Sequence, residues 1–294
     1  MTVLNIRHRT TYRYREPVRL GPHRLMLRPR ESRDVRLLSS TLEMTPAASV
    51  SWTTDVFGNA VATASFAVPA DELAVESWAT VELDASLWPV FEIAASAIHY
   101  PFFYSNEERT DLGALAVPQT FDASGRLAEW SLGFVRGERT DTLALLKDMV
   151  TGVAGIGYQS REAEGTQTPL QTIDRGWGSC RDFAVLFAEA ARCLGFGARI
   201  ISGYLYNPDR APVREGSGPN GSAMGANSTH AWNEIFLPGA GRITFDPTNR
   251  AVGGYNLIPL AVGRVIAQVM PMTGTFLATS DAYLGMSVEV EVTT

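Results

Sequence analysis

Apolar and polar side chains alternate through the first third of the chain, and this period-two pattern restricts that part to extended strands. Gly58 and Asn59 mark the tightest turn, because both residue types tolerate a positive φ. Strand-like runs separated by turn residues occur at 3–15, 35–44, 49–57, 60–68 and 73–83. Short strands at this spacing predict an antiparallel, β-sandwich-like domain over residues 1–105.

The arginines of the first strand raise the question of a nucleic-acid partner. Residues 1–36 hold ten Arg and three acidic residues, which gives this segment a net charge of +7. Because the whole chain has a net charge of −6, the remaining residues carry −13. Four of these arginines fall on the polar face of the strand: Arg7, Arg9, Arg13 and Arg15. A strand with a charged outer face accounts for them, so we expect no nucleic-acid partner. His8 falls on the apolar face and is expected to be a hydrogen-bonded core residue.

Composition excludes several other classes of protein. Two cysteines in 294 residues exclude a disulfide framework and a zinc site built mainly from thiolates. No stretch approaches the roughly 18 apolar residues of a membrane helix, and the first residues lack the apolar centre of a signal peptide. We therefore expect a cytoplasmic protein with no membrane partner. No phosphate-binding or calcium-binding loop pattern is visible, so no cofactor is expected.

The pattern changes near Pro101, where helical periodicity replaces the alternation. Thr168-Pro169 is typical of a helix start, with a capping residue followed by proline at the first helical position. Further helices are predicted near 107–116, 122–134 and 141–152, and β-rich runs at Ala198–Tyr206, Thr229–Leu237 and Arg242–Pro247. We therefore predict an α+β chain whose second domain, with the C-terminal strands, covers residues 106–294.

Cys180 is predicted to stand at the N-terminal end of a helix. Apolar residues repeat at helical spacing from Phe183 to Leu194, and Gly195 occupies the position of a C-terminal cap. Unpaired backbone N–H groups and the helix dipole stabilise a thiolate at such a position. A buried structural cysteine is the alternative, and it is the interpretation that suits Cys193. The helix would separate the two cysteines by roughly 20 Å, which excludes a disulfide.

The predicted hairpin carries a histidine and an aspartate whose proximity depends on strand register. A five-residue connection, Leu237–Gly241, places Asp246 opposite Trp232 and diagonal to His230 on the same face. A four-residue connection places the two side chains on opposite faces. In the first register the carboxylate orients the imidazole, whose other nitrogen faces the thiolate.

Three segments resemble, in the same order, those of the bacterial transglutaminase-like superfamily. The cysteine segment is Gly176–Ala184 (GWGSCRDFA), the histidine segment is Thr229–Glu234 (THAWNE), and the aspartate segment is Phe245–Asn249 (FDPTN). The N-terminal run, including Asp55–Asn59 (DVFGN), is similar to the β domain that commonly precedes this core. The resemblance spans nearly the whole chain.

The resemblance implies a papain-like core with a Cys–His–Asp triad, carried here by Cys180, His230 and Asp246. It implies thiolate attack on an amide carbonyl and a thioester intermediate, which water or an amine resolves. We expect a cysteine-dependent amide hydrolase or acyltransferase, with hydrolysis favoured and a peptide or protein as substrate. The backbone N–H of Cys180 is the natural oxyanion donor. Candidates for a second donor or a substrate contact are Trp177, Gln171 and Trp232.

This chain departs from many members of the family at two positions of the cysteine segment and its helix. Many members have Gln after the cysteine and His five residues after it, where this chain has Arg181 and Val185. The departures concern the substrate pocket rather than the triad.

Two other functions fit the same residues. One is a non-catalytic binding module that kept the fold, and the other is a metal-dependent hydrolase with Cys180, His230 and Asp246 as ligands. Alkylation of Cys180 at neutral pH tests the first, and metal analysis of the purified protein tests the second. Residues 207–228 are predicted to form a long Gly-rich loop next to His230, either a substrate-binding loop or a plain insertion.

Overall fold

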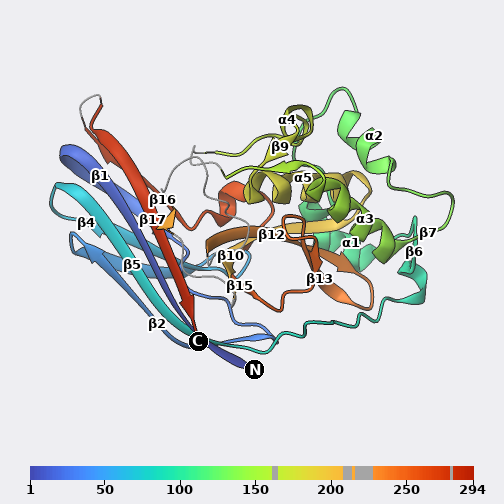
Figure 1. The fold of residues 1–294 in the computed structure, drawn as a ribbon, viewed down its shortest axis with the longest axis horizontal. Helices are drawn as coiled ribbons and strands as arrows, with labels where there is room; N and C mark the ends of the chain where they lie inside the picture. The colour runs from blue at the N-terminus through green and yellow to red at the C-terminus, as the bar shows by residue number, and fades with distance from the viewer. Residues whose placement is uncertain (161–164, 208–213, 216–227, 279–280) are drawn as a thin grey trace.

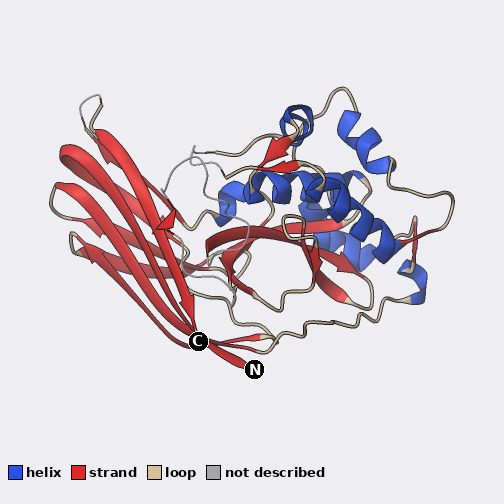
Figure 2. Ribbon diagram, viewed as in Figure 1, coloured by secondary structure: helices blue, strands red, loops and turns tan. Residues whose placement is uncertain are grey.

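The computed structural model describes residues 1–160, 165–207, 214–215, 228–278 and 281–294, and it confirms the predicted α+β class. A curled antiparallel sheet occupies one side of the molecule, and helices with a second antiparallel sheet occupy the other (Figure 1) (Figure 2). The strands of the curled sheet are β1 (Thr2–Leu25), β2 (Val35–Thr45), β3 (Ala48–Thr54), β4 (Ala60–Phe66), β5 (Ala70–Leu83), β11 (Arg214–Glu215), β16 (Met272–Leu277) and β17 (Tyr283–Thr293).

The five predicted N-terminal strands are confirmed as β1 to β5, and β1 is longer than predicted. Its first half lies between β5 and β17, and its last residues pair with β4 and β16. Because one strand takes part in both halves, the predicted sandwich-like arrangement takes the form of a single curled sheet.

The C-terminal strands correct the predicted domain boundary. The sequence predicts a second domain over residues 106–294, but β16 and β17 pair with β1 and so belong to the N-terminal sheet. These pairings satisfy backbone groups that β1 would otherwise leave open at a sheet edge. The N-terminal domain therefore contains both ends of the chain, which lie side by side in Figure 1.

The second sheet has the strand order β14-β13-β12-β10-β15, and α5 packs against β10 and β12. Its strands are β10 (Gly197–Leu205), β12 (Ser228–Leu237), β13 (Gly241–Asp246), β14 (Ala251–Val252) and β15 (Leu257–Gly263). The helices are α1 (Asn106–Leu112), α2 (Arg126–Leu132), α3 (Thr142–Ala154), α4 (Pro169–Arg175) and α5 (Cys180–Cys193), with 3₁₀ turns η1 (Ala95–Ala97), η2 (Gly113–Ala116) and η3 (Ile266–Val269). Two short pairs complete the described elements: β6 (His99–Tyr100) with β7 (Thr140–Asp141), and β8 (Gly157–Tyr158) with β9 (Trp177–Gly178).

Glycines explain where two predicted helices differ from the observed ones. The predicted helix 107–116 divides into α1 and η2 at Gly113, whose φ of 45° is incompatible with a continuous α-helix. The predicted helix 122–134 begins later, as α2, because Gly125 precedes it with a φ of 69°. Among the described residues, no helix combines the length and the apolar character that a bilayer crossing requires.

His8 is buried as predicted and connects the two sheets. Its Nδ1 lies 3.0 Å from the hydroxyl of Tyr204 on β10, and its Nε2 lies 2.8 Å from Oγ1 of Thr10. Burial lowers the pKa of His8 to about 4, so the ring is neutral at physiological pH. Because the ring is neutral and both of its nitrogens are hydrogen-bonded, His8 is a structural residue, as expected.

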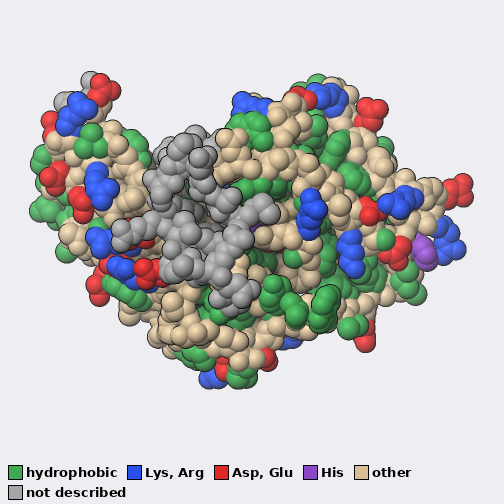
Figure 3. Space-filling view, viewed as in Figure 1, with side chains coloured by type: hydrophobic (Ala, Val, Ile, Leu, Met, Phe, Trp, Pro, Cys, Tyr) green, Lys and Arg blue, Asp and Glu red, His purple; other side chains and the backbone are tan. Residues whose placement is uncertain are grey.

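The charged face of β1 is paired with carboxylates of the neighbouring strand β5. Arg7 and Arg9 both lie within salt-bridge distance of Glu76, and Arg13 lies 3.5 Å from Glu72. Positive and negative side chains are interspersed on this side of the molecule (Figure 3). The sequence interpretation of a strand with a charged outer face therefore accounts for these arginines.

A buried ion pair anchors the C-terminal half of α5. The carboxylate of Glu189 accepts the backbone N–H groups of Gln119 (2.7 Å) and Thr120 (2.6 Å) and pairs with Arg192. Arg192 also donates to the carbonyls of Ala198 (2.8 Å), Leu115 (3.1 Å) and Arg264 (2.6 Å). Both side chains are at most 3 % exposed, so α5 is bonded to three surrounding segments through one guanidinium.

Replacing Arg192 by methionine should lower the free energy of unfolding by about 3–5 kcal/mol, because the Glu189 charge would stay buried without its cation. Urea denaturation followed by circular dichroism measures the effect. The exposed Arg109 provides the control, since Arg109→Met should change stability by no more than about 0.5 kcal/mol. A loss below about 1 kcal/mol for Arg192→Met would contradict the anchoring role.

Candidate active site

Cys180 is the first residue of α5, as predicted. The preceding helix α4 ends at Arg175 and is capped by Gly176, whose φ of 68° turns the chain toward β9. The N–H of Gly157 on β8 donates to the carbonyl of Gly176 at 3.0 Å, so backbone approaches this glycine segment closely, as the sequence indicates. Cys180 is half-buried, which leaves part of its side chain accessible at the end of the helix.

The hairpin takes the first of the two predicted registers. Leu237 pairs with Gly241, and Asn233 pairs with Phe245, which places Asp246 opposite Trp232. His230 Nε2 then lies 2.8 Å from Oδ2 of Asp246. Of the two registers that the sequence leaves open, the observed one brings the histidine and the aspartate together.

The thiol of Cys180 is hydrogen-bonded to His230, so three elements meet at one point. Cys180 comes from α5, His230 from β12 and Asp246 from β13. Because Nε2 of the imidazole faces Asp246, Nδ1 is the nitrogen left for the sulfur. His230 is 6 % exposed and Asp246 is 1 % exposed, so water reaches the array mainly from the side of Cys180.

Burial and charge act in opposite directions on this pair. Burial lowers the pKa of His230, but the charge and hydrogen bond of Asp246 and the contact with Cys180 outweigh burial and raise it to about 10. Burial would raise the pKa of Asp246, whereas the charge and hydrogen bonds of His230 and Asn249 hold it below its ordinary value. At neutral pH the histidine is therefore an imidazolium and the aspartate a carboxylate.

Asn249 is a site residue that sequence reasoning did not single out. Its Nδ2 donates to Oδ2 of Asp246 at 2.7 Å and lies 3.4 Å from Nε2 of His230. The backbone N–H groups of Thr248 (3.0 Å) and Asn249 (3.2 Å) donate to Oδ1 of Asp246. The turn after β13 thus holds the carboxylate in one orientation. The available signal was the Asp-Pro-Thr-Asn sequence, which is typical of a turn capped by its own aspartate.

Asp182 is the second residue that sequence reasoning passed over. Its carboxylate is fully buried and accepts the backbone N–H (2.9 Å) and the hydroxyl (2.8 Å) of Ser179. It also accepts the N–H of Gln167 at 2.7 Å, and the Gln167 side chain donates to the carbonyl of Trp177. These bonds hold the segment that leads into Cys180. Ser and Asp three residues apart at a helix start were the signal.

The three candidates for substrate contacts have different surroundings. Trp177 is half-buried on β9, and the guanidinium of Arg175 lies 5.8 Å from its ring centre. Gln171 is exposed, and its Oε1 accepts the N–H of Thr168 at 2.9 Å, which caps α4. Trp232 is only 2 % exposed and stacks on His230 with 5.9 Å between ring centres. A side chain this buried offers no surface to a substrate, so we correct Trp232 from a substrate contact to a neighbour of the histidine.

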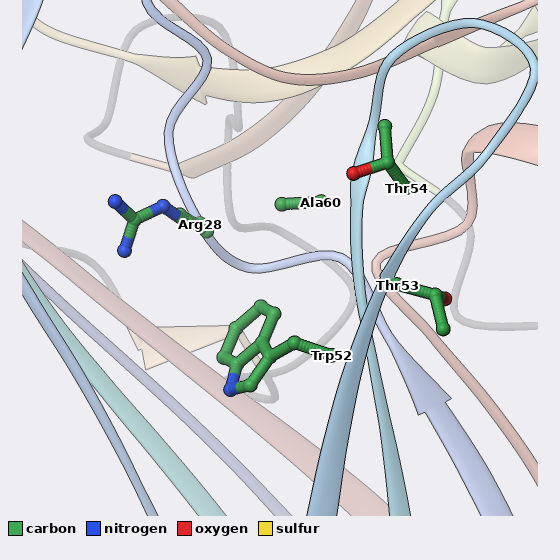
Figure 4. A pocket seen from close by; sticks show the side chains of 5 residues that line it. All are labelled: Arg28, Trp52, Thr53, Thr54 and Ala60. Atoms are coloured by element: carbon green, nitrogen blue, oxygen red, sulfur yellow. The ribbon is translucent and has the colours of Figure 1, made fainter.

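The cavity shown in Figure 4 lies on the N-terminal domain, and its lining residues do not include Cys180, His230 or Asp246. It has a volume of about 340 Å³ and is lined by Arg28, Trp52, Thr53, Thr54 and Ala60. The predicted loop 207–228 falls largely outside the described residues, so its role stays a prediction. Within the described residues, no three His, Cys, Asp or Glu side chains are grouped to hold a metal ion.

Relatives in mycobacteria match almost the entire chain. The protein Rv2569c of Mycobacterium tuberculosis is 27% identical over 300 residues, which cover 97% of this chain and 91% of the relative. The protein ML0607 of Mycobacterium leprae is 24% identical over 305 residues, with 98% of each chain covered. Both relatives are named as uncharacterised.

Family models and a solved structure agree with the two-part architecture. Residues 4–82 match the bacterial transglutaminase-like N-terminal region, and residues 129–247 match the transglutaminase-like superfamily. A protein of Cytophaga hutchinsonii, described as a "Putative Cysteine Protease", has the same fold, with a TM-score of 0.73 and 19% identity over 99% of this chain and 90% of that chain. The chain is therefore a member of the transglutaminase-like superfamily that carries the bacterial N-terminal region of these proteins.

Proposed function

We propose that the protein is a cysteine-dependent amide hydrolase or acyltransferase that acts on peptide-like substrates through a thioester. The observation that supports the proposal is the bonded array of Cys180, His230 and Asp246 at the start of α5. Each member stands where its role requires it: a nucleophile at a helix N-terminus, a histidine within hydrogen-bonding reach, and a buried carboxylate that orients the histidine. The superfamily assignment favours a cysteine enzyme in general.

In the proposed reaction the thiolate of Cys180 attacks the carbonyl carbon of an amide. The negative charge that develops on the carbonyl oxygen is stabilised by the backbone N–H of Cys180 and the dipole of α5. His230 then gives its proton to the leaving nitrogen, the C–N bond breaks, and the acyl group remains on sulfur as a thioester. His230 next accepts a proton from water or from an amine, which attacks the thioester and releases an acid or a new amide.

Asp246 keeps Nε2 of His230 occupied throughout, so Nδ1 stays directed at the sulfur and at the leaving group. Asn249 and the turn after β13 hold Asp246 in place in the same way. Trp177 is the candidate for a second oxyanion donor, because it is half-buried in the segment that leads into Cys180. A cytoplasmic location and a peptide or protein partner stay predictions.

A peptide library incubated with the protein, with and without an added primary amine, tests the proposal. Mass spectrometry should find new carboxyl ends without amine and amine adducts at the same peptide positions when amine is present. Cys193→Ala serves as the matched control and should retain turnover, since Cys193 lies at the far end of α5. A wild-type protein that neither cleaves nor modifies any peptide, and whose Cys180 reacts no faster than a free thiol, would favour the binding module.

A further inference from the structure

The turn between β3 and β4 is held rigid by one aspartate. Asp55 Oδ1 accepts the N–H groups of Phe57 and Asn59, both at 2.9 Å, and Asp55 Oδ2 accepts Nδ2 of Asn59 at 2.8 Å. Gly58 completes the turn with a φ of 74°, and its N–H donates to the carbonyl of Asp55 at 2.9 Å. Phe57 is therefore presented by a backbone with little freedom to move.

The same turn is bonded to the second sheet. Asn59, which is fully buried, donates from Nδ2 to the carbonyl of Val262 at 2.8 Å and accepts the N–H of Val262 on Oδ1 at 2.9 Å. Arg30 donates to the same Oδ1 at 2.7 Å. The asparagine amide thus pairs with β15 as a neighbouring strand would, and it fixes the N-terminal domain against the sheet that carries His230.

Phe57 reaches the neighbourhood of the histidine through this contact. Its half-buried ring packs against an apolar cluster on the second sheet: Ile201, Leu205, Trp232, Leu257 and Val262. Trp232 is the member of that cluster that stacks on His230, with an angle of 25° between the rings. Packed side chains therefore run from Phe57 on the N-terminal domain, through the cluster that contains Trp232, to His230 of the triad.

Gly203 shows how tightly Trp232 is held from the other side. Gly203 pairs with His230 across β10 and β12, and a Cβ added to it would lie 2.5 Å from Cη2 of Trp232 and 2.1 Å from the carbonyl oxygen of Ile258. The indole therefore occupies space that any side chain at this position would take. With Gly203 at its edge and the apolar cluster around it, the indole has little room to move, and the imidazole stacks on it.

We propose that the N-terminal β domain positions the catalytic histidine, with Phe57 acting as a positioning residue through Trp232. The inference rests on the proposed function and adds a role for the domain that precedes the core. Without the phenylalanine ring, Trp232 would gain room to shift, and His230 would lose the flat surface that keeps its nitrogens aligned with Asp246 and Cys180. Misplacement of a reacting group by about 1 Å can cost up to 10²-fold in rate.

The rate constant for alkylation of Cys180 by iodoacetamide at pH 7, with the labelled site identified by peptide mapping, tests the inference without a substrate. Phe57→Ala should lower the rate constant by between about tenfold and 10²-fold, and Phe57→Leu should restore most of it. Two control variants, Val56→Ala and Phe66→Ala, should leave the rate constant unchanged. Val56 lies in the same turn but is 91 % exposed. Phe66 lies at the far end of the hairpin, where its half-buried ring packs against the N-terminal core and His23.

The outcomes separate this inference from the proposed function. If wild-type Cys180 reacts no faster than a free thiol, the proposed function fails, and this inference fails with it. If wild-type Cys180 is activated but Phe57→Ala matches it, the positioning role alone is overturned. An equal loss in Phe66→Ala would also overturn it, since general loosening would then account for the effect. Circular dichroism checks folding, and Phe57→Val, expected between the Ala and Leu variants, replaces Phe57→Ala if that variant does not fold.

Discussion

Replacing Cys180 by alanine is expected to abolish turnover of amide substrates, because no other side chain at this position can form the thioester. The variant should fold normally, since Cys180 is half-buried and its capping partners Ser179 and Asp182 remain. Turnover of an identified peptide, measured with matched concentrations of wild type and variant, gives the result directly. Activity that survives at the wild-type level would remove Cys180 from the mechanism.

Selective alkylation provides an independent measurement of the same expectation. Burial raises the pKa of Cys193, with the charges of Glu189 and Asp122 acting in the same direction, so its thiol is protonated and inert at neutral pH. Stoichiometric iodoacetamide should therefore label Cys180, and activity should fall in proportion to labelling. Labelling of Cys193 with full activity retained would contradict the assignment.

Asp246→Asn is expected to slow acylation while leaving the fold nearly intact. The change keeps the shape of the side chain but removes the charge that holds His230 as an imidazolium. The comparable change in a serine protease costs about 10⁴-fold, which sets the upper limit here. Asn249→Ala, which leaves that charge in place, should cost much less. Single-turnover kinetics separate acylation from later steps, and wild-type rates in Asp246→Ala would exclude the carboxylate from the triad.

The same variant should show a characteristic dependence of stability on pH. Folding raises the His230 pKa from 6.5 to about 10, so its contribution is complete below about pH 6.5 and is lost as the pH rises through about 10. Folding lowers the Asp246 pKa from 3.8, so its contribution is present above about pH 4 and is lost at lower pH. The difference in unfolding free energy between wild type and Asp246→Asn should be largest between about pH 4 and 6.5. Urea titrations across the pH range measure it, and a difference independent of pH would contradict the ion pair.

Several features follow from local sequence alone. The alternation of Leu73 and Val75 with polar neighbours is a property of consecutive residues, and it predicted β5 within a few residues of its observed bounds. The cysteine helix was predicted for a similar reason, because its periodicity and its closing glycine lie within one segment. The order of the cysteine, histidine and aspartate segments indicated the superfamily without any knowledge of contacts.

Local patterns predict that two strands form a hairpin, but they do not predict the register in which the strands pair. The hairpin from Leu237 to Gly241 left two registers open from sequence, because both keep the turn residues in allowed positions. The observed register brings Asp246 to His230, and the other would have separated them. Residues 230–233 of β12 are all buried, so the register is settled by how both faces of the strand pack in the assembled core and not by a local pattern.

Local patterns predict the N-terminal strands and the helix that begins at Cys180, because each depends on neighbours in the chain. The folded chain alone shows that β17 pairs with β1, that Asn249 supports Asp246, and that Phe57 packs against the cluster that contains Trp232. The pairing of β17 with β1 and the packing of Phe57 join residues far apart in sequence, and no local period encodes such a partner. Asn249 and Asp246 are only three residues apart in sequence. Their hydrogen bond matters because the carboxylate is buried, and that burial exists only once the whole chain has folded.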